Sequence, residues 1–537
     1  MQERSSSEKR PENVSGSFSK LLTSQEASEP LVSEQPSSQE PSTAQPASTL
    51  VREPASEDEL PDELLGEQAR EKSDYQLDES ATDKNQVSGV GAGKPLEQSP
   101  YSTESPSSSE SSGDDFEVAV VTSRSWDSRE AGKELARKLH EKLKHQPKFI
   151  LLFTTIHYEK YGGFQPILDE IYNVFPEEVP LVGGTIAGFM NQEGAYTRGA
   201  TAMAVYSDKT DVVLGVGHNI KRNQKEAANE VLKKINEPLL KSKRKNTVII
   251  DIISGVTVPS IPGMNKIVVI RNKLLASLSI AILKISSIIF QKGIGREEIV
   301  LNEIKNKIGK TVGVFGGSTM DNVVFSRSFE FANKEVLKNS VVLLSVMTDL
   351  NFEIKGGHGF NQRGDRFYNI TTGAWDRVIA TIDGKPAVGE YLNKFNWSYE
   401  LVNENTFHRR FIFNPVGFVD SEGKLQPFVA GGFFGGNYVG GGPIQGNKIC
   451  YLQASGKDLL NTTDQLTDAT NSKGIFFFTY CGSRLEAFGA WNYKVQERLT
   501  ERLKQDFLVI STTGENYCQP SGKMKVLTVT FNLLKIA

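Results

Sequence analysis

Val182-Gly183-Gly184-Thr185 and Phe315-Gly316-Gly317-Ser318-Thr319 carry one pattern at two places, with the glycine pairs 133 residues apart. Each stretch follows an apolar segment typical of a strand and a second segment with helical spacing. An apolar run and then a Gly-His pair come after each of them. The repetition predicts two copies of one unit, packed about a pseudo-twofold axis. Two glycine turns would then face each other across a shared cleft.

Strand and helix patterns alternate in both copies, which we place at about 115–240 and 245–395. The first copy closes with two apolar runs, 200–206 and 211–217, which we interpret as an antiparallel strand pair. The alternation predicts a mixed α/β (α+β) fold built from a duplicated strand-helix-strand-hairpin unit. Residues 396–537, with a glycine-rich run that indicates turns between short strands, would form a further α+β domain.

The first 114 residues are rich in Ser, Glu and Pro, and we interpret them as a disordered acidic tail. Residues 1–115 hold 9 basic and 24 acidic side chains, whereas the remainder holds 52 and 41. The net charge of −4 therefore combines an acidic tail with a basic body. A basic body attracts an anionic ligand or partner.

Several classes of protein are disfavoured. The basic run at 241–245 fits a solvated linker before a strand, so we expect no nucleic-acid binding. An apolar segment from Leu274 to Phe290 lies in an insert, about 255–292, that has no counterpart in the first copy. It is short for a membrane span, and we expect a buried helix or an amphipathic one with Lys284 facing outward. Three scattered cysteines indicate neither disulfides nor a metal site, and suggest a reducing, cytoplasmic location without a cofactor.

The glycine stretches are the first candidate ligand site. Backbone N–H groups and a hydroxyl at each stretch could bind a carboxylate, from Gly183, Gly184, Thr185, Gly316, Gly317 and Ser318. The alternative is that the glycines only permit a positive φ or close packing. His358, among glycines, could donate to the same carboxylate. A turn histidine bonded to backbone is the alternative.

Three C-terminal residues complete the candidate site. Cys481 follows an apolar run and precedes Arg484, so a neighbouring cation could lower the pKa of its thiol. Inert packing is the alternative. Arg484 has forked donors that suit a carboxylate. Its alternative role is an ion pair with Glu515 that joins two loops.

The chain resembles the FIST proteins, whose name stands for F-box and intracellular signal transduction. The stretches V-G-G-T-I-A-G at 182–188 and G-G-S at 316–318 are similar to that family. So are I-D-G-K-P-A at 382–387, Y-C-G-S-R at 480–484 and T-G-E at 513–515. The resemblance implies a FIST N domain at 115–395 and a FIST C domain at 396–537.

The resemblance also implies a sensory protein that binds a small ligand, with amino acids as candidates, and passes a signal to a protein partner. We therefore expect a ligand-binding protein without catalytic activity. Two other functions stay open. One is an enzyme with Cys481 as its nucleophile, and the other is an adaptor that recruits a partner through the acidic tail.

Overall fold

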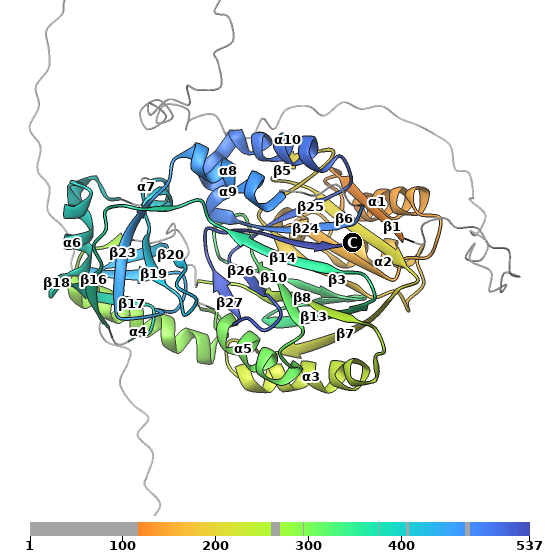
Figure 1. Ribbon diagram of the computed structural model, residues 1–537, viewed down its shortest axis with the longest axis horizontal. Helices are drawn as coiled ribbons and strands as arrows, with labels where there is room; N and C mark the ends of the chain where they lie inside the picture. The colour runs from red at the N-terminus through yellow and green to blue at the C-terminus, as the bar shows by residue number, and fades with distance from the viewer. Residues whose placement is uncertain (1–115, 259–268, 294, 374, 404–406, 468–472) are drawn as a thin grey trace, which may run out of the picture. The chain divides into compact units, whose positions relative to one another are not determined.

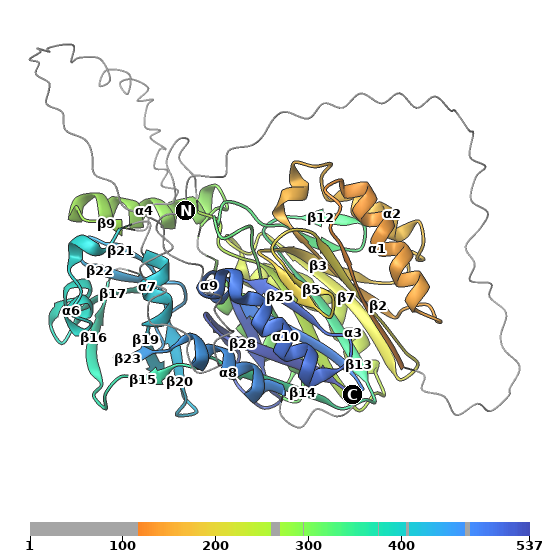
Figure 2. The same cartoon turned by 90° about the horizontal axis from the view of Figure 1, so that it is seen from above.

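The computed structural model describes residues 116–258, 269–293, 295–373, 375–403, 407–467 and 473–537 (Figures 1 and 2). The predicted tail, residues 1–114, lies outside them, as do residues 259–268 of the predicted insert. Helices and strands are mixed throughout the described residues, which confirms the α/β class. The strands form three six-stranded sheets and one ten-stranded sheet.

The first sheet joins N-terminal strands to a hairpin from farther along the chain. Its order is β1 (Phe116–Ser123), β6 (Ala200–Ser207), β2 (Phe149–Thr155), β3 (Leu181–Ile186), β11 (Glu330–Ala332) and β12 (Glu335–Leu337). Helices α1 (Ser128–Lys142) and α2 (Gln165–Tyr172) cover its outer face. The Asp127 side chain caps α1 by accepting a hydrogen bond from the Glu130 N–H. Apolar residues at four-residue spacing, from Ala131 to Leu139, then turn one side of α1 to the sheet.

The second sheet repeats this arrangement. Its order is β7 (Thr210–His218), β13 (Ser340–Thr348), β8 (Asn246–Ser254), β10 (Gly313–Thr319), β26 (Glu515–Cys518) and β27 (Lys525–Leu527). Helices α3 (Gln224–Lys241) and α5 (Glu297–Ile308) pack on its outer face. The expected pairing of 200–206 with 211–217 is wrong, because β6 lies in the first sheet and β7 in the second. The turn between them carries the chain from one sheet to the next.

The third sheet has the same arrangement again, and the sequence did not indicate it. Its order is β14 (Phe352–Gly357), β28 (Phe531–Ile536), β24 (Ile475–Cys481), β25 (Leu508–Thr512), β4 (Phe189–Asn191) and β5 (Gly194–Tyr196). Its outer face is covered by α8 (Gly456–Thr467), α9 (Gly482–Phe488) and α10 (Asn492–Leu503). Short 3-10 helices occupy Ile156–Glu159 and Gly489–Trp491.

All three sheets share one pattern of pairing. From the first strand listed, the successive pairs are antiparallel, antiparallel, parallel, antiparallel and antiparallel. The last two strands are always a hairpin from another repeat: β11–β12, β26–β27 and β4–β5. The expected pseudo-twofold arrangement is therefore wrong. The chain contains three repeats that exchange hairpins in a cycle.

One apolar core lies between the three sheets. It takes Phe153 from the first sheet, Phe315 from the second and Phe477 from the third. The ring of Phe477 lies 5.9 Å from that of Phe153 and 5.5 Å from that of Phe315, between centroids. Figure 1 shows three groups of helices on different sides of the strands: α1 with α2, α3 with α5, and α8 with α9 and α10. Each sheet is therefore buried on both faces, which explains why β2, β10 and β24 are apolar or small throughout.

The glycine pairs lie inside β3 and β10, so the expected glycine turns are wrong. A Cβ on Gly183 would lie 1.6 Å from the Leu152 carbonyl oxygen, and one on Gly316 would lie 1.8 Å from that of Asp251. Above Gly316, the Asn516 amide donates a 2.8 Å hydrogen bond to the Asp251 carboxyl. Close packing is thus a sufficient reason for both glycines.

A ten-stranded sheet is inserted into the third repeat, and we call it the inserted sheet. Its main path is β20 (Leu425–Phe428), β19 (Val416–Val419), β23 (Lys448–Gln453), β16 (Tyr368–Thr372), β17 (Val378–Ile382), β22 (Asn437–Gly440), β21 (Ala430–Phe434) and β9 (Val269–Ile270). Strands β15 (Asn361–Gln362) and β18 (Lys385–Pro386) pair with β23 and β17. The associated helices are α4 (Lys273–Ile289), α6 (Ala387–Lys394), α7 (Phe407–Phe413) and a 3-10 turn, Tyr399–Leu401. The glycine-rich run at 431–446 forms short strands and turns, as predicted.

The contact at Gly316 generates a stability prediction. The Gly316→Ala substitution places a methyl group against a backbone oxygen, which cannot rotate away. We expect β10 and β8 to separate, and the free energy of unfolding to fall by about 3 kcal/mol or more. Urea denaturation followed by circular dichroism measures this change.

Gly389→Ala is the matched control, because a Cβ at this position in α6 meets no atom within 4 Å. Alanine is favoured over glycine inside a helix by about 0.5–1 kcal/mol, so the control should be neutral or stabilising. A Gly316→Ala protein with the wild-type urea midpoint would contradict the close approach of β10 to β8.

Candidate functional site

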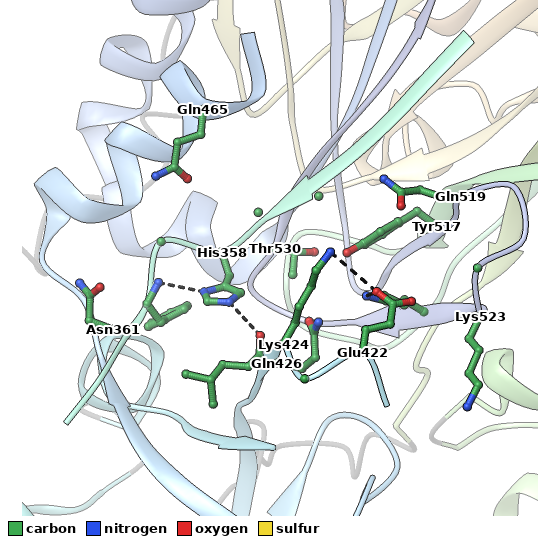
Figure 3. Close-up of a pocket in the computed structure, with 18 of the residues that line it drawn as sticks. His358, Asn361, Glu422, Lys424, Gln426, Gln465, Tyr517, Gln519, Lys523 and Thr530 are labelled. Atoms are coloured by element: carbon green, nitrogen blue, oxygen red, sulfur yellow. Dashed lines mark hydrogen bonds and ion pairs between the residues drawn. The ribbon is translucent and has the colours of Figure 1, made fainter. Parts of the chain in front are cut away.

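A pocket of about 580 Å³ lies between the third repeat and the inserted sheet (Figure 3). Five segments line it: the end of β14, the turn between β19 and β20, helix α8, the β26–β27 hairpin with its loop, and Thr530 just before β28. The polar side chains among them include His358, Glu422, Lys424, Gln426, Asp458, Asn461, Gln465, Tyr517, Gln519, Lys523, Lys525 and Thr530. Its size suits a small molecule of the amino-acid class.

His358 is the one residue of the predicted site that lines this pocket. Its Nδ1 lies 2.9 Å from the Phe360 N–H, and its Nε2 lies 3.0 Å from the Leu425 carbonyl oxygen. Nδ1 therefore accepts and Nε2 donates, which is the pattern of a neutral imidazole. Burial lowers the pKa of His358, so this form persists at neutral pH. The alternative of a turn histidine bonded to backbone is confirmed, and the ring fastens β14 to the inserted sheet.

Lysines and carboxylates alternate around the pocket. Lys525 lies 3.0 Å from both Asp420 and Glu422. Burial would raise the pKa of Asp420, but hydrogen bonds from the Lys424 N–H and from Lys525 outweigh it and lower this pKa to about 2. Lys424 forms an ion pair with Glu422 (Figure 3), with 3.7 Å between the ammonium nitrogen and the nearest carboxylate oxygen. Lys523 is exposed and has no hydrogen bond or ion pair with any described residue.

Thr530 connects the pocket to a carboxyl buried behind it. The Thr530 N–H and hydroxyl donate to Glu515 Oε2 over 3.2 and 3.1 Å. The Thr512 hydroxyl donates to Oε1 over 3.1 Å. Glu515 is fully buried, and desolvation raises its pKa to about 8. This shift favours the protonated form of Glu515 at neutral pH.

The second repeat contains the same arrangement. Glu330 accepts from the Thr319 hydroxyl over 2.6 Å and from the Ser340 N–H over 3.1 Å. Burial raises its pKa to about 7. Glu330 lies opposite Gly184 in the first sheet, as Glu515 lies opposite Gly317 in the second.

The strand ends of all three repeats meet in a ring of backbone hydrogen bonds. The N–H groups of Thr185, Ser318 and Ser511 donate to the carbonyls of Phe329, Gly514 and Gly188 over 2.9, 2.9 and 2.8 Å. In return, the carbonyls of Thr185, Ser318 and Ser511 accept from Met320, Thr513 and Ala187. The predicted residues 183–185 and 316–318 are thus brought together, but their backbone groups bind neighbouring strands. Their role in ligand binding stays a prediction.

Arg484 is buried behind the pocket. Its guanidinium donates to the His358 carbonyl over 3.1 Å, and also to the carbonyls of Leu459 and Val529. These bonds tie β14, α8 and the segment before β28 together. The side chain therefore holds the pocket wall in place through its two terminal nitrogens, while its buried Nε has no hydrogen-bond partner among the described residues.

Cys481 lies at the end of β24, buried beside Glu515. Burial and the neighbouring carboxyl raise the pKa of its thiol to about 12. The expected lowering of this pKa is therefore wrong. A thiol that stays protonated and inaccessible is a poor nucleophile, so the structure gives no support to the enzyme alternative.

The pocket lysines could not be found from the sequence. Lys424 and Lys525 stand about 100 residues apart in the chain, on a turn and beside a hairpin, with no shared motif. Only the Gly-His pair at 357–358 gave a signal. Ser511 was missed because the third repeat has Val509-Ile510 where the others have glycine pairs.

The raised pKa of Glu515 generates a prediction. Between its ordinary pKa of 4.5 and about 8, the folded chain keeps this proton and the unfolded chain releases it. The stability that Glu515 contributes is full below that range and is lost as the pH rises through it. Glu515→Gln removes this titration. We expect the stability of the wild type relative to E515Q to fall by about 1.4 kcal/mol per pH unit between pH 5 and 7.5.

Urea unfolding at a series of pH values measures that difference, and the comparison cancels other titrating groups such as His157 and His358. Glu497→Gln, on the exposed face of α10, is the matched control and should track the wild type. A wild type and E515Q whose stabilities stay parallel would show that Glu515 is ionised in the folded chain.

Three comparisons with known proteins show what this chain is similar to. Residues 148–385 match the family model for the FIST N domain. An uncharacterized protein, MJ1623, of Methanocaldococcus jannaschii is 26% identical over 146 residues, which is 26% of this chain and 28% of that protein. A solved structure, cyanuric acid hydrolase from A. caulinodans, aligns with a TM-score of 0.28 and 6% identity over 78% of this chain and 98% of its own. The family match therefore assigns a FIST N domain to residues 148–385 of this chain.

Proposed function

We propose that this FIST protein is a cytoplasmic sensor that binds a small, carboxylate-bearing ligand in the pocket beside His358. The observation that carries the proposal is the set of charges on the pocket wall. Lys424, Lys523 and Lys525 line it together with two carboxylates, Glu422 and Asp458, and Lys525 also pairs with Asp420, which is not part of the lining; His358 is neutral. Lys523 has no ion pair with a described residue, so it is the cation that we assign to an anionic ligand.

The polar groups fit an amino acid better than a simple anion. The carboxylate would bind Lys523, since an ammonium group holds a carboxylate by charge-assisted hydrogen bonds. The amides of Asn461 and Gln465 line the opposite wall, from α8. Asp458, on the same helix, would bind the ligand's ammonium group. Residues 396–537, which we predict to be the FIST C half, supply most of these groups.

The signal would pass through Thr530. This residue lines the pocket and also donates to Glu515. A ligand that takes the Thr530 hydroxyl weakens one of the bonds to Glu515, and so favours the protonated carboxyl. In this proposal, the strand ends at 183–185 and 316–318 do not contact the ligand. They hold the strand that carries Glu515 in position. Such a ligand shifts the conformation only if its affinity differs between the two states.

A panel of amino acids tests the proposal by thermal shift on the full chain. A ligand present at 100 times its dissociation constant stabilises the folded state by about 2.7 kcal/mol, which raises the melting temperature by a few degrees. We expect at least one acid in the panel to do so. Lys523→Ala should remove most of that rise, because it deletes the cation that meets the carboxylate.

Lys243→Ala is the matched control, since Lys243 is also exposed but lies far along the chain from every segment of the pocket. It should keep the full rise. A rise that survives Lys523→Ala unchanged would place the ligand elsewhere, and no rise with any acid would contradict a carboxylate ligand.

A further inference from the structure

Helix α4 has two apolar faces, and only one of them is packed. Ala276, Ile280 and Leu283 contact the inserted sheet at Phe434 and Val439. A Cβ on Gly435 would lie 2.9 Å from Ala276, so the helix is seated closely on that sheet. Figure 2 shows α4 along the edge of the structure, above β9 and β21. The sequence predicted a helix here, and the structure confirms it.

The opposite face of α4 is an exposed aliphatic stripe. Leu274, Leu278, Ile282, Ile285 and Ile289 follow helical spacing, with exposed fractions from 52% to 82%. At about 100° per residue, these positions point away from Ala276 and its neighbours. The expectation of a buried helix, or of an amphipathic one with Lys284 facing outward, is therefore wrong, because aliphatic side chains occupy the outward face. Seven of the fifteen exposed large hydrophobic residues of the described chain lie between Leu274 and Phe290, whereas the others are mostly scattered.

The charged residues of the segment that holds the stripe are all basic. Residues 269–295 contain Arg271, Lys273, Lys284 and Lys292, and no acidic residue. Lys273 and Lys284 are eleven positions apart, so they lie on the same flank of the helix, beside the stripe. Long basic side chains at such a border can reach phosphate groups while their stems cover apolar surface.

We propose that α4 docks this protein on an anionic lipid surface. An aliphatic face bordered by basic residues, with no acidic residue, is the pattern of a helix that lies in the headgroup region of a bilayer. At about 1.5 Å per residue, its 17 residues present roughly 25 Å of stripe. The helix lies on the lipid and does not cross it. Among the described residues, no helix has the length and apolar content that a membrane crossing requires.

A second copy of the chain fits the stripe less well. If two α4 helices packed with their stripes face to face, the lysines beside one stripe would lie close to the lysines beside the other. Like charges at that distance repel, and the stripe stands out on a helix instead of lining a groove. Anionic headgroups, in contrast, complement the flank along its whole length.

Sedimentation with vesicles tests the proposal on the full chain. Vesicles of phosphatidylcholine with 30% phosphatidylserine should pellet the protein, and vesicles of pure phosphatidylcholine should bind it about tenfold more weakly. The double variant Leu278→Asp, Ile285→Asp should lose binding by at least about tenfold, because it places charge in the stripe. Leu240→Asp, at an aliphatic residue that is 87% exposed on α3, is the matched control and should bind as the wild type does.

A second variant, Lys273→Glu with Lys292→Glu, keeps the stripe and should lose the preference for phosphatidylserine. Melting temperatures check that all variants fold. Equal binding to both vesicle types, or binding that survives the two aspartates, would overturn the proposal. So would a wild type that ignores vesicles but forms a dimer, by light scattering, that the two aspartates dissociate.

Discussion

The exchange of hairpins among three repeats is the constraint on which the rest of the structure depends. Each six-stranded sheet is completed by two strands from another repeat, so no repeat can form its own sheet alone. Two buried carboxyls, Glu330 and Glu515, arrive on these hairpins and face Gly184 and Gly317. A Cβ on those glycines would lie 2.6 Å and 2.7 Å from the methyl groups of Thr319 and Thr512, which bind the same carboxyls. Because the second glycine of each pair has no side chain, it leaves room for the threonine whose hydroxyl binds the glutamate.

The three repeats are alike in backbone and differ in chemistry. In the hairpin of the first repeat, Phe189 stands where the other two hairpins have a glutamate. It lies opposite Ile510, and the contact there is apolar. The third repeat carries all of the inserted sheet except β9, and the turn between β19 and β20 forms one wall of the pocket. Thr530 lines the pocket and donates to the buried Glu515, so it joins the pocket to that carboxyl. In the function proposed above, this contact makes the protonation of Glu515 depend on the ligand.

Much of this fold could be predicted from local patterns, and its assembly could not. Strand and helix periodicity located the elements of the first two repeats, because both are buried and strongly patterned. The third repeat was missed, since Val509 and Ile510 replace the glycine pair and about 100 inserted residues separate β14 from α8. A hairpin that pairs with another repeat leaves no local signal either.

The candidate site was predicted only in part, for similar reasons. His358 was found because glycines surround it. Cys481 and Arg484 are both buried, and burial gives them roles that their residue types alone do not reveal. The thiol is kept neutral, and the guanidinium is used on backbone carbonyls. The lysines of the pocket lie on separate loops, whose meeting depends on the tertiary fold.

A crystal structure of the chain with the amino acid that most raises its melting temperature tests the central claim most directly. We expect the ligand in the pocket beside His358, with its carboxylate about 2.7–3.2 Å from the Lys523 ammonium nitrogen. Ligand density at the strand ends of residues 183–185 and 316–318, with the pocket empty, would contradict it.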